Sequence, residues 1–319
     1  MLASPIRHCV VTSRYLPSGK YGACPLCFIC SHALDFLIRL TPVKFVDRRS
    51  TKVVIVPSLQ HTKFTARRVG RAVHILCSRD ALCGINNYRG HTMHPNLINY
   101  VAHLLRLRVL QELELLVEQL EHSRRTFKIS NGLQPILRRL TRCEWKQLKE
   151  TGIMPPGDGV AVLVVPPLNK NPVTGQRPES SMSASPLTSN MKPRSPLPPL
   201  SLMLNASDVL ANPKFPDMIP AYQIPLYNGL ALFPNEYQRA ALHSLLLRIL
   251  TVERRLYQST IQAKGQKRSD EKHSHAFLLS SNSDLIRRGD VSAVAIALWR
   301  IRMFEGSLED DSTWTSIFE

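Results

Sequence analysis

Hydrophobic residues recur at helical spacing over the thirty residues from Asn96 to Arg125. This stretch contains no Gly or Pro and is rich in Leu, Glu, Gln and Arg, which favour helix formation. Charged residues such as Arg106, Glu112 and Glu118 interrupt the apolar run, so the pattern predicts a packed helix and not a membrane span. The predicted apolar face consists of Leu97, Val101, Leu104, Leu105, Val109, Leu113, Leu116 and Leu120.

Three further helices and a few extended segments are predicted from the same patterns and their flanking residues. Asn235 and Asp290 stand where N-caps are expected, and Gly152 and Gly306 stand where helices end. The helices cover residues 133–151, 236–261 and 291–305, and apolar runs at Lys52–Val56 and Val160–Val165 favour short strands. The pattern therefore predicts a mainly α fold, a helical bundle interrupted by a long Pro/Ser-rich linker, with one or two short extended segments.

Composition divides the chain into five segments. Residues 166–220 hold twelve of the 23 prolines together with many Ser residues, which indicates a linker. The predicted organisation is a basic targeting or disordered extension at 1–92, an N-terminal helical half at 93–165, the linker at 166–218, a C-terminal helical half at 219–306 and an acidic tail at 307–319.

The net charge of +17 is concentrated in the first third of the chain. Residues 1–92 contain fourteen Lys and Arg against three Asp, whereas the remainder contains 27 Lys and Arg against 21 Asp and Glu. An N-terminal region rich in Arg and Ser and poor in acidic residues is typical of a mitochondrial transit peptide. Two alternatives remain open: a basic disordered tail, or an extension preceding a folded body that begins at Met93.

Candidate metal ligands occur in one place. Cys24, Cys27, Cys30 and His32 have a spacing that a tetrahedral zinc site can use. Leu26, Phe28 and Ile29 lie among them, so the same stretch also fits a small apolar patch, which is the interpretation we adopt. We expect no metal and no cofactor.

The sequence contains no nucleophile elbow, Walker loop, dinucleotide fingerprint or metalloprotease helix. We therefore expect a protein that is not an enzyme and that acts by binding. The candidate binding residues are four cations at helical spacing and a neighbouring aromatic residue, which suits contact with a nucleic-acid backbone or an acidic partner. They are Arg138, Arg142, Trp145, Lys146 and Lys149. The alternative is an exposed charged face with Trp145 packed inward.

Several short motifs resemble those of a fungal mitochondrial family. They are Cys143–Leu148, Gln223–Gly229, Val252–Tyr257 and Ala297–Arg300, together with the Pro-rich middle of the chain. In these segments the chain resembles the genetic-interactor-of-prohibitin family of mitochondrial genome maintenance proteins. The resemblance implies a mitochondrial matrix protein that supports the mitochondrial genome or its expression and respiratory growth. It transfers no catalytic residue.

Two functions follow as expectations. The first is a matrix factor that contacts mitochondrial nucleic acid or the mitoribosome. The second is a helical interaction scaffold, or a mitoribosome-associated adaptor without nucleic-acid contact, whose linker recruits a protein partner through Pro196–Leu200.

Overall fold

A computed structural model describes the chain in several stretches. They are residues 6–13, 15–17, 36–47, 50–66, 71–85, 92–93, 96–126, 134–154, 158–170, 172–186, 201–205, 223–262, 273–286, 288–289 and 291–306. The candidate ligands Cys24–His32, the Pro196–Leu200 segment and the acidic tail lie outside these residues. The chain divides into two compact units, each described by itself. Unit 1 is Met1–Gln111, Ser183–Ser195 and Ile296–Glu319, and unit 2 is Glu112–Met182 and Pro196–Ala295.

Unit 1 contains a hairpin and a four-stranded sheet. In the hairpin β1 (Ile6–His8) pairs antiparallel with β2 (Tyr15–Pro17). The sheet has the order β5-β3-β4-β6, in which β3 pairs antiparallel with β4 and β5, and β4 pairs parallel with β6. Its strands are β3 (Leu37–Asp47), β4 (Ser50–Pro57), β5 (Val73–Leu76) and β6 (Thr92–Met93).

The helices of unit 1 are α1 (Arg79–Cys83) and parts of two longer helices, α2 (Leu97–Thr126) and α8 (Val291–Glu305). Residues 97–111 of α2 and residues 296–305 of α8 belong to this unit. Arg106 on α2 is buried and forms an ion pair with Glu305 on α8, which Arg79 also contacts. Arg300 on α8 donates to the Leu37 carbonyl of β3 at 3.4 Å. Charge pairs with a buried carboxylate thus join the helices of unit 1, and a hydrogen bond from buried Arg300 joins α8 to the sheet.

Unit 2 contains a six-stranded mixed sheet of order β7-β12-β9-β11-β10-β8. The pairs β9–β11 and β10–β8 are parallel, and the other pairs are antiparallel. Its strands are β7 (Leu137–Thr141), β8 (Ile153–Met154), β9 (Gly159–Val164), β10 (Ser201–Asn205), β11 (Gln223–Asn228) and β12 (His273–Ser280).

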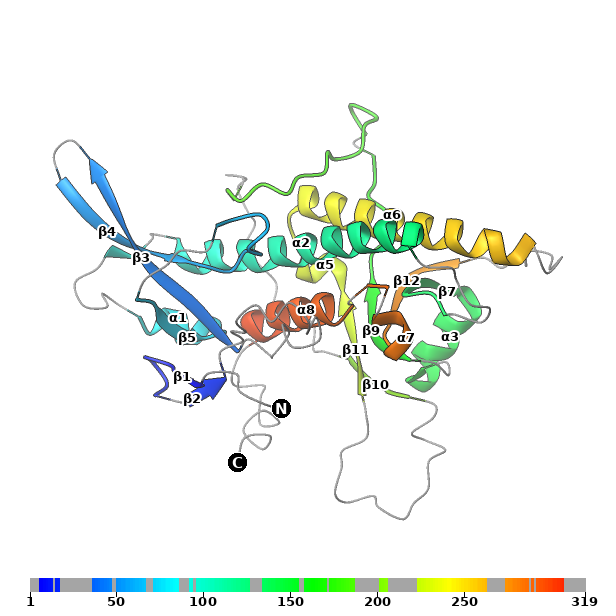
Figure 1. Cartoon of the computed structure of the whole chain (residues 1–319), viewed down its shortest axis with the longest axis horizontal. Coiled ribbons are helices and arrows are strands. Elements are labelled where there is room, and N and C mark those ends of the chain that lie inside the picture. The colour runs from blue at the N-terminus through cyan, green and yellow to red at the C-terminus, as the bar shows by residue number, and fades with distance from the viewer. Residues whose placement is uncertain are drawn as a thin grey trace, which may run out of the picture. The chain divides into compact units, whose positions relative to one another are not determined.

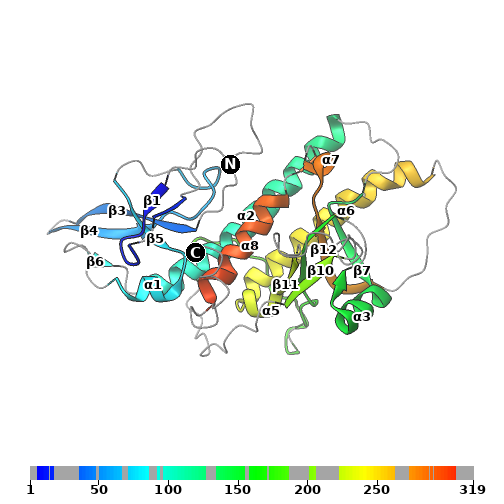
Figure 2. The ribbon, with the colours of Figure 1, turned by 90° about the horizontal axis from the view of Figure 1, so that it is seen from below.

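Helices lie on both sides of the unit 2 sheet. In Figures 1 and 2, α3 (Arg142–Thr151) and α6 (Glu236–Gln262) lie on opposite sides of strands β7 and β12. The short helices α5 (Gly229–Leu232) and α7 (Ser283–Ile286) follow β11 and β12. The second half of α2 also belongs to this unit, where Glu114 and Glu121 form ion pairs with Arg248 on α6.

The predicted mainly α helical bundle is wrong. Within the described residues the chain is mixed α/β, with sheets of four and six strands besides the hairpin. The helices at 96–125, 236–261 and 291–305 and the strands at 52–56 and 160–165 are confirmed. The error has two causes. Buried strands show little alternation of hydrophobic and polar residues. Other strands form mainly because they pair with distant segments, which no local pattern reveals.

Two further segments also differ from what their sequence indicates. Apart from the strand at 52–56, residues 1–92 were expected to form a basic targeting or disordered extension, yet their described part also contains β3, β5 and α1, with a buried core that includes Leu37, Ile38 and Ile75. Residues 264–275 are almost entirely polar and carry no strand pattern, yet β12 begins at His273. Among the described residues, no helix combines the length and hydrophobicity that a bilayer-spanning segment needs.

Candidate nucleic-acid interface

The helix that carries the candidate residues, α3, begins at Arg142 and not at Leu133. Thr141 accepts a hydrogen bond from the Glu144 backbone N–H at 3.1 Å, and the Glu144 carboxylate accepts one from the Thr141 N–H at 2.8 Å. This reciprocal capping box fixes the first turn. Gly152 ends the helix in the left-handed region, at φ 68°, and donates to the Leu148 carbonyl. The Thr-x-x-Glu signal was present in the sequence, and it was missed because Leu137–Thr141 also fitted helical spacing.

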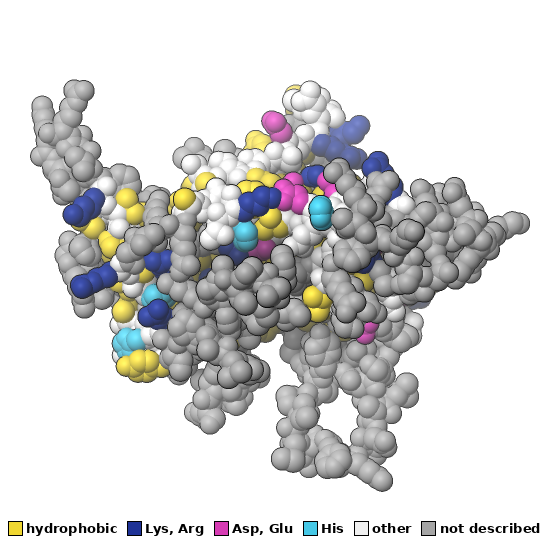
Figure 3. Space-filling model, in the orientation of Figure 1, with side chains coloured by type: hydrophobic (Ala, Val, Ile, Leu, Met, Phe, Trp, Pro, Cys, Tyr) yellow, Lys and Arg dark blue, Asp and Glu magenta, His cyan; other side chains and the backbone are white. Residues whose placement is uncertain are grey.

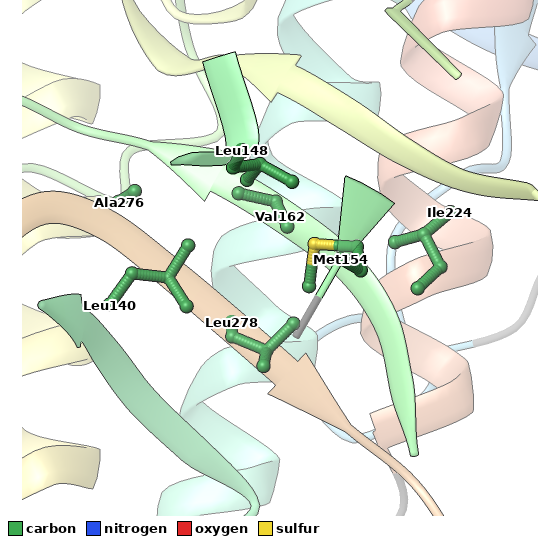
Figure 4. Packing of buried hydrophobic residues seen from close by; sticks show 7 residues of the cluster. All are labelled: Leu140, Leu148, Met154, Val162, Ile224, Ala276 and Leu278. Atoms are coloured by element: carbon green, nitrogen blue, oxygen red, sulfur yellow. The ribbon is translucent and has the colours of Figure 1, made fainter. Parts of the chain in front are cut away.

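One buried side chain anchors α3 to the sheet. Leu148 packs into a cluster formed by strands β7, β8, β9, β11 and β12 (Figure 4). Half-buried Trp145 packs against the same cluster. Because the helix is capped at both ends and anchored in the core, its outward side chains have a fixed spacing. The remaining members of the cluster are Leu140, Met154, Val162, Ile224, Ala276 and Leu278.

Three of the four predicted cations share the outer face of α3. Arg142, Lys146 and Lys149 are exposed and stand at positions i, i+4 and i+7 of the helix. The Lys149 Nζ lies 5.0 Å from the centre of the Trp145 ring, a cation–π contact. The Lys146 Nζ is 3.9 Å from Glu150 Oε1, but the two side chains are 79% and 63% exposed, so this ion pair contributes little to stability. We call Arg142, Trp145, Lys146 and Lys149 the α3 face.

The fourth predicted cation, Arg138, does not belong to the α3 face. It lies on β7, and its Nη1 is 3.0 Å from both carboxylate oxygens of Glu144. Burial alone raises the pKa of Glu144, but hydrogen bonds from Arg138 and Thr141 outweigh this effect and hold the pKa below its usual value. The charge of Arg138 is therefore neutralised within the protein, and the predicted four-cation stripe is wrong at this position.

A second group of basic residues, which the sequence pattern did not predict, lies on the α6 side of the sheet. Arg139 follows Arg138 on β7, so strand alternation directs it to the other side of the sheet, toward α6. Its guanidinium carbon lies 5.1 Å from the centre of the Phe277 ring on β12. A strand assignment for Leu137–Thr141 would have directed Arg138 and Arg139 to opposite sides of a sheet. The predicted helix gave Arg139 no such position, and it was not among the candidate residues.

Searches of protein-family models, curated proteins and solved structures find no match to this chain.

Proposed function

We propose that this chain is a non-enzymatic factor of the mitochondrial matrix that supports maintenance or expression of the mitochondrial genome and binds nucleic acid through the α3 face. The observation that carries the binding proposal is the exposure of Arg142, Lys146 and Lys149 on one capped helix beside Trp145. The mitochondrial part of the proposal is supported by the basic, acid-poor first third of the chain and by the resemblance in sequence.

The geometry of the α3 face suits a phosphate backbone. From Arg142 to Lys149 the helix rises by about 10 Å, so its cations can follow successive phosphates of one strand. Trp145 packs against the core cluster and its ring is in contact with Lys149, so we assign the binding to the cations and not to base stacking. Neutralising three phosphates gives a salt dependence, d log K/d log [salt], of about −2 to −3. Such binding is weak and independent of sequence.

The test measures binding of the full chain to single-stranded and duplex oligonucleotides over a range of salt concentrations. We expect Arg142→Gln and Lys149→Gln each to weaken binding and to reduce the salt slope by about 0.7 to 0.9. Lys170→Gln is a matched control, because Lys170 is an exposed cation of unit 2 that is not part of α3. Arg138→Gln serves as a second control, since Glu144 already neutralises that charge. Equal slopes for the parent and the α3 variants would exclude the α3 face as a nucleic-acid interface.

Localisation is tested separately by importing the full chain into isolated mitochondria. We expect it to become resistant to external protease, and this resistance to be lost when the membrane potential is dissipated, because a cationic segment is drawn inward by an inside-negative potential. A chain that remains accessible to protease in energised mitochondria would contradict a matrix location.

A further inference from the structure

A group of basic side chains gathers on the α6 side of the unit 2 sheet. Arg139 comes from β7, Arg177 from the segment 172–182, His243 and Arg254 from α6, and His275 from β12. The segment is tied to α6 by a hydrogen bond from the Ser181 N–H to the Tyr237 carbonyl at 3.3 Å. We call these five residues the α6-side cluster.

Strand register places two members of the α6-side cluster on the same side of the sheet: Arg139 on β7 pairs with Phe277 on β12, so it lies on the same side as His275, two residues before Phe277. The positive charges of Arg139, Arg177 and His275 contribute to the lowered pKa of His243, and that of Arg254 contributes to the lowered pKa of Arg139. His243 and Arg254 are eleven residues apart, close to three turns, so they lie on the same side of α6. Arg139 is therefore the central member, with His243, Arg177 and His275 toward one end of the cluster and Arg254 toward the other.

None of these five residues forms an ion pair with a carboxylate of the described chain. The acidic residue adjacent to Arg254 on α6, Glu253, is already paired with Arg288. Glu179 and Glu236 form no ion pair within the described stretches. Other arginines of unit 2 do have acidic partners: Arg138 pairs with Glu144, Arg248 with Glu114 and Glu121, and Arg288 with Glu253. The positive charges of the α6-side cluster are therefore near one another, and no carboxylate of the described residues pairs with them.

The interactions within the α6-side cluster are repulsive, and a bound anion would relieve them. The Arg139 Nε is buried and has no hydrogen-bond partner among the described residues. A buried donor without a partner is costly, and an oxyanion is the partner that a guanidinium accepts best. Lys and Arg side chains form several small groups on the face shown in Figure 3, and the central group lies beside Asp and Glu side chains.

We propose that the α6-side cluster binds a divalent oxyanion, in the cell a phosphate group, with Arg139 and His243 in direct contact and Arg177, His275 and Arg254 supplying further positive charge. This site lies on the side of the sheet opposite to α3, and it does not depend on the α3 face. The phosphate group comes either from a small phosphorylated metabolite such as a nucleotide or from the backbone of a nucleic acid, and the two sources are separated by the test below.

Binding at this site is coupled to the protonation of His243. Burial lowers the pKa of His243, and the cations Arg139 from β7, Arg177 from the 172–182 segment and His275 from β12 lower it further. The other cations on α6 are Arg239, Arg248, Arg254 and Arg255. Arg239 donates to the carbonyls of Phe233 and Pro234, and Arg248 pairs with Glu114 and Glu121. A dianion favours the imidazolium form and raises this pKa. Affinity therefore increases as the pH falls through the pKa of His243.

The test is a titration of the full chain with sulfate, which remains divalent between pH 5 and 8, with imidazole signals followed by NMR. We expect saturable binding of one sulfate, a rise in the pKa of His243 on binding, and tighter binding at pH 5.5 than at pH 7.5. Arg139→Gln should weaken sulfate binding by about tenfold or more, because a charge-assisted hydrogen bond is lost. Arg177→Gln should weaken it severalfold, and Arg254→Gln should weaken it least, because Arg254 lies three turns from His243.

Control variants distinguish sulfate binding at the α6-side cluster from nonspecific attraction of sulfate to a positively charged protein. Arg138→Gln and Lys170→Gln should bind sulfate as the parent does, and so should Arg142→Gln, so that failure of the α3 proposal leaves this result unchanged. If Arg139→Gln does not fold, the exposed Arg177→Gln variant decides. Binding that does not saturate, or that weakens equally in the controls, overturns the site. In competition arms, displacement of sulfate by ATP points to a nucleotide-like source, and displacement only by an oligonucleotide points to a nucleic-acid backbone.

Discussion

Arg288 donates a hydrogen bond of 2.8 Å to the Glu253 carboxylate in the interior of unit 2, where the two side chains are only 7% and 3% exposed. The Arg288 carbonyl also accepts from the Ser123 hydroxyl at 2.8 Å. The pair thus joins α6 and the 288–289 segment, and the carbonyl contact extends the connection to α2. Burial raises the pKa of Glu253, and Arg288 opposes this rise without cancelling it.

Replacing one member of this pair should be costly. Arg288→Met leaves a buried carboxylate without its cation, and we expect the free energy of unfolding at pH 7 to fall by about 3–5 kcal/mol. Part of this loss should be recovered at pH 5, because Glu253 can then take up a proton. The measurement is urea denaturation at both pH values.

Two matched variants test this reasoning. Arg248→Met removes an ion-paired arginine that is 45% exposed, so its cost should stay below about 1 kcal/mol. The double variant Arg288→Met/Glu253→Leu removes both charges and should be more stable than Arg288→Met alone. If Arg288→Met and Arg248→Met cost the same, the buried pair has no special role.

We expect the contribution of Glu144 to stability to depend on pH. Its pKa is depressed in the folded state, so it stabilises the protein above its unfolded pKa of about 4.3, and this contribution is lost as the pH falls through the folded pKa. Glu144→Gln retains an oxygen acceptor for the cap but loses the charge that Arg138 contacts. We expect a loss of about 0.5–1 kcal/mol at pH 7, because both side chains remain partly exposed, and little difference from the parent at pH 3. An equal loss at both pH values would show that the cap, and not the charge, is responsible.

Two leucines of α6 test which side of that helix is buried. Leu245 is 5% exposed and Leu247 is 37% exposed, although they are only two residues apart. Leu245→Asp places an unpaired carboxylate in the core and should cost several kcal/mol, enough to unfold unit 2. Leu247→Asp should fold and lose less than about 1 kcal/mol. Circular dichroism and thermal unfolding of both variants give the answer, and a folded Leu245→Asp protein would contradict the position of α6.

Deleting residues 1–92 should destabilise unit 1 and leave unit 2 intact. The deletion removes β3, β4 and β5, which contain the buried residues Leu37, Ile55 and Ile75. It also removes the Leu37 carbonyl that Arg300 contacts, whereas unit 2 contains no residue before Glu112. Amide hydrogen exchange should increase in residues 97–111 and 296–305 and remain slow in β9 and β12. Unchanged protection of residues 97–111 would restore the interpretation that the folded body begins at Met93.

The fold was predictable where a segment carries its own pattern. The thirty-residue α2 and the Val-rich β9 have uninterrupted periodicity or composition, so local preference and tertiary packing agree. Strands β7 and β12 were not predictable in this way. Leu137–Thr141 spans five residues, over which helical and extended spacing are hard to distinguish, and it becomes a strand because it pairs with Phe277–Leu279. Within β12, the apolar residues 276–279 are preceded by a polar stretch that favoured a loop.

Some features of the candidate site were likewise predictable from the sequence, and others were not. The spacing of Arg142, Lys146 and Lys149 and the capping signal at Thr141 are local, so the residue pattern is enough to place these cations on one helix face. The pairing of Arg138 with Glu144, and the position of Arg139 near His243 and Arg177 on the opposite side of the sheet, arise only when the chain folds. The reason is physical: the charge state and surroundings of a side chain depend on groups brought near it by folding, and the chain separates Arg139 from His243 by about a hundred residues that no local pattern connects.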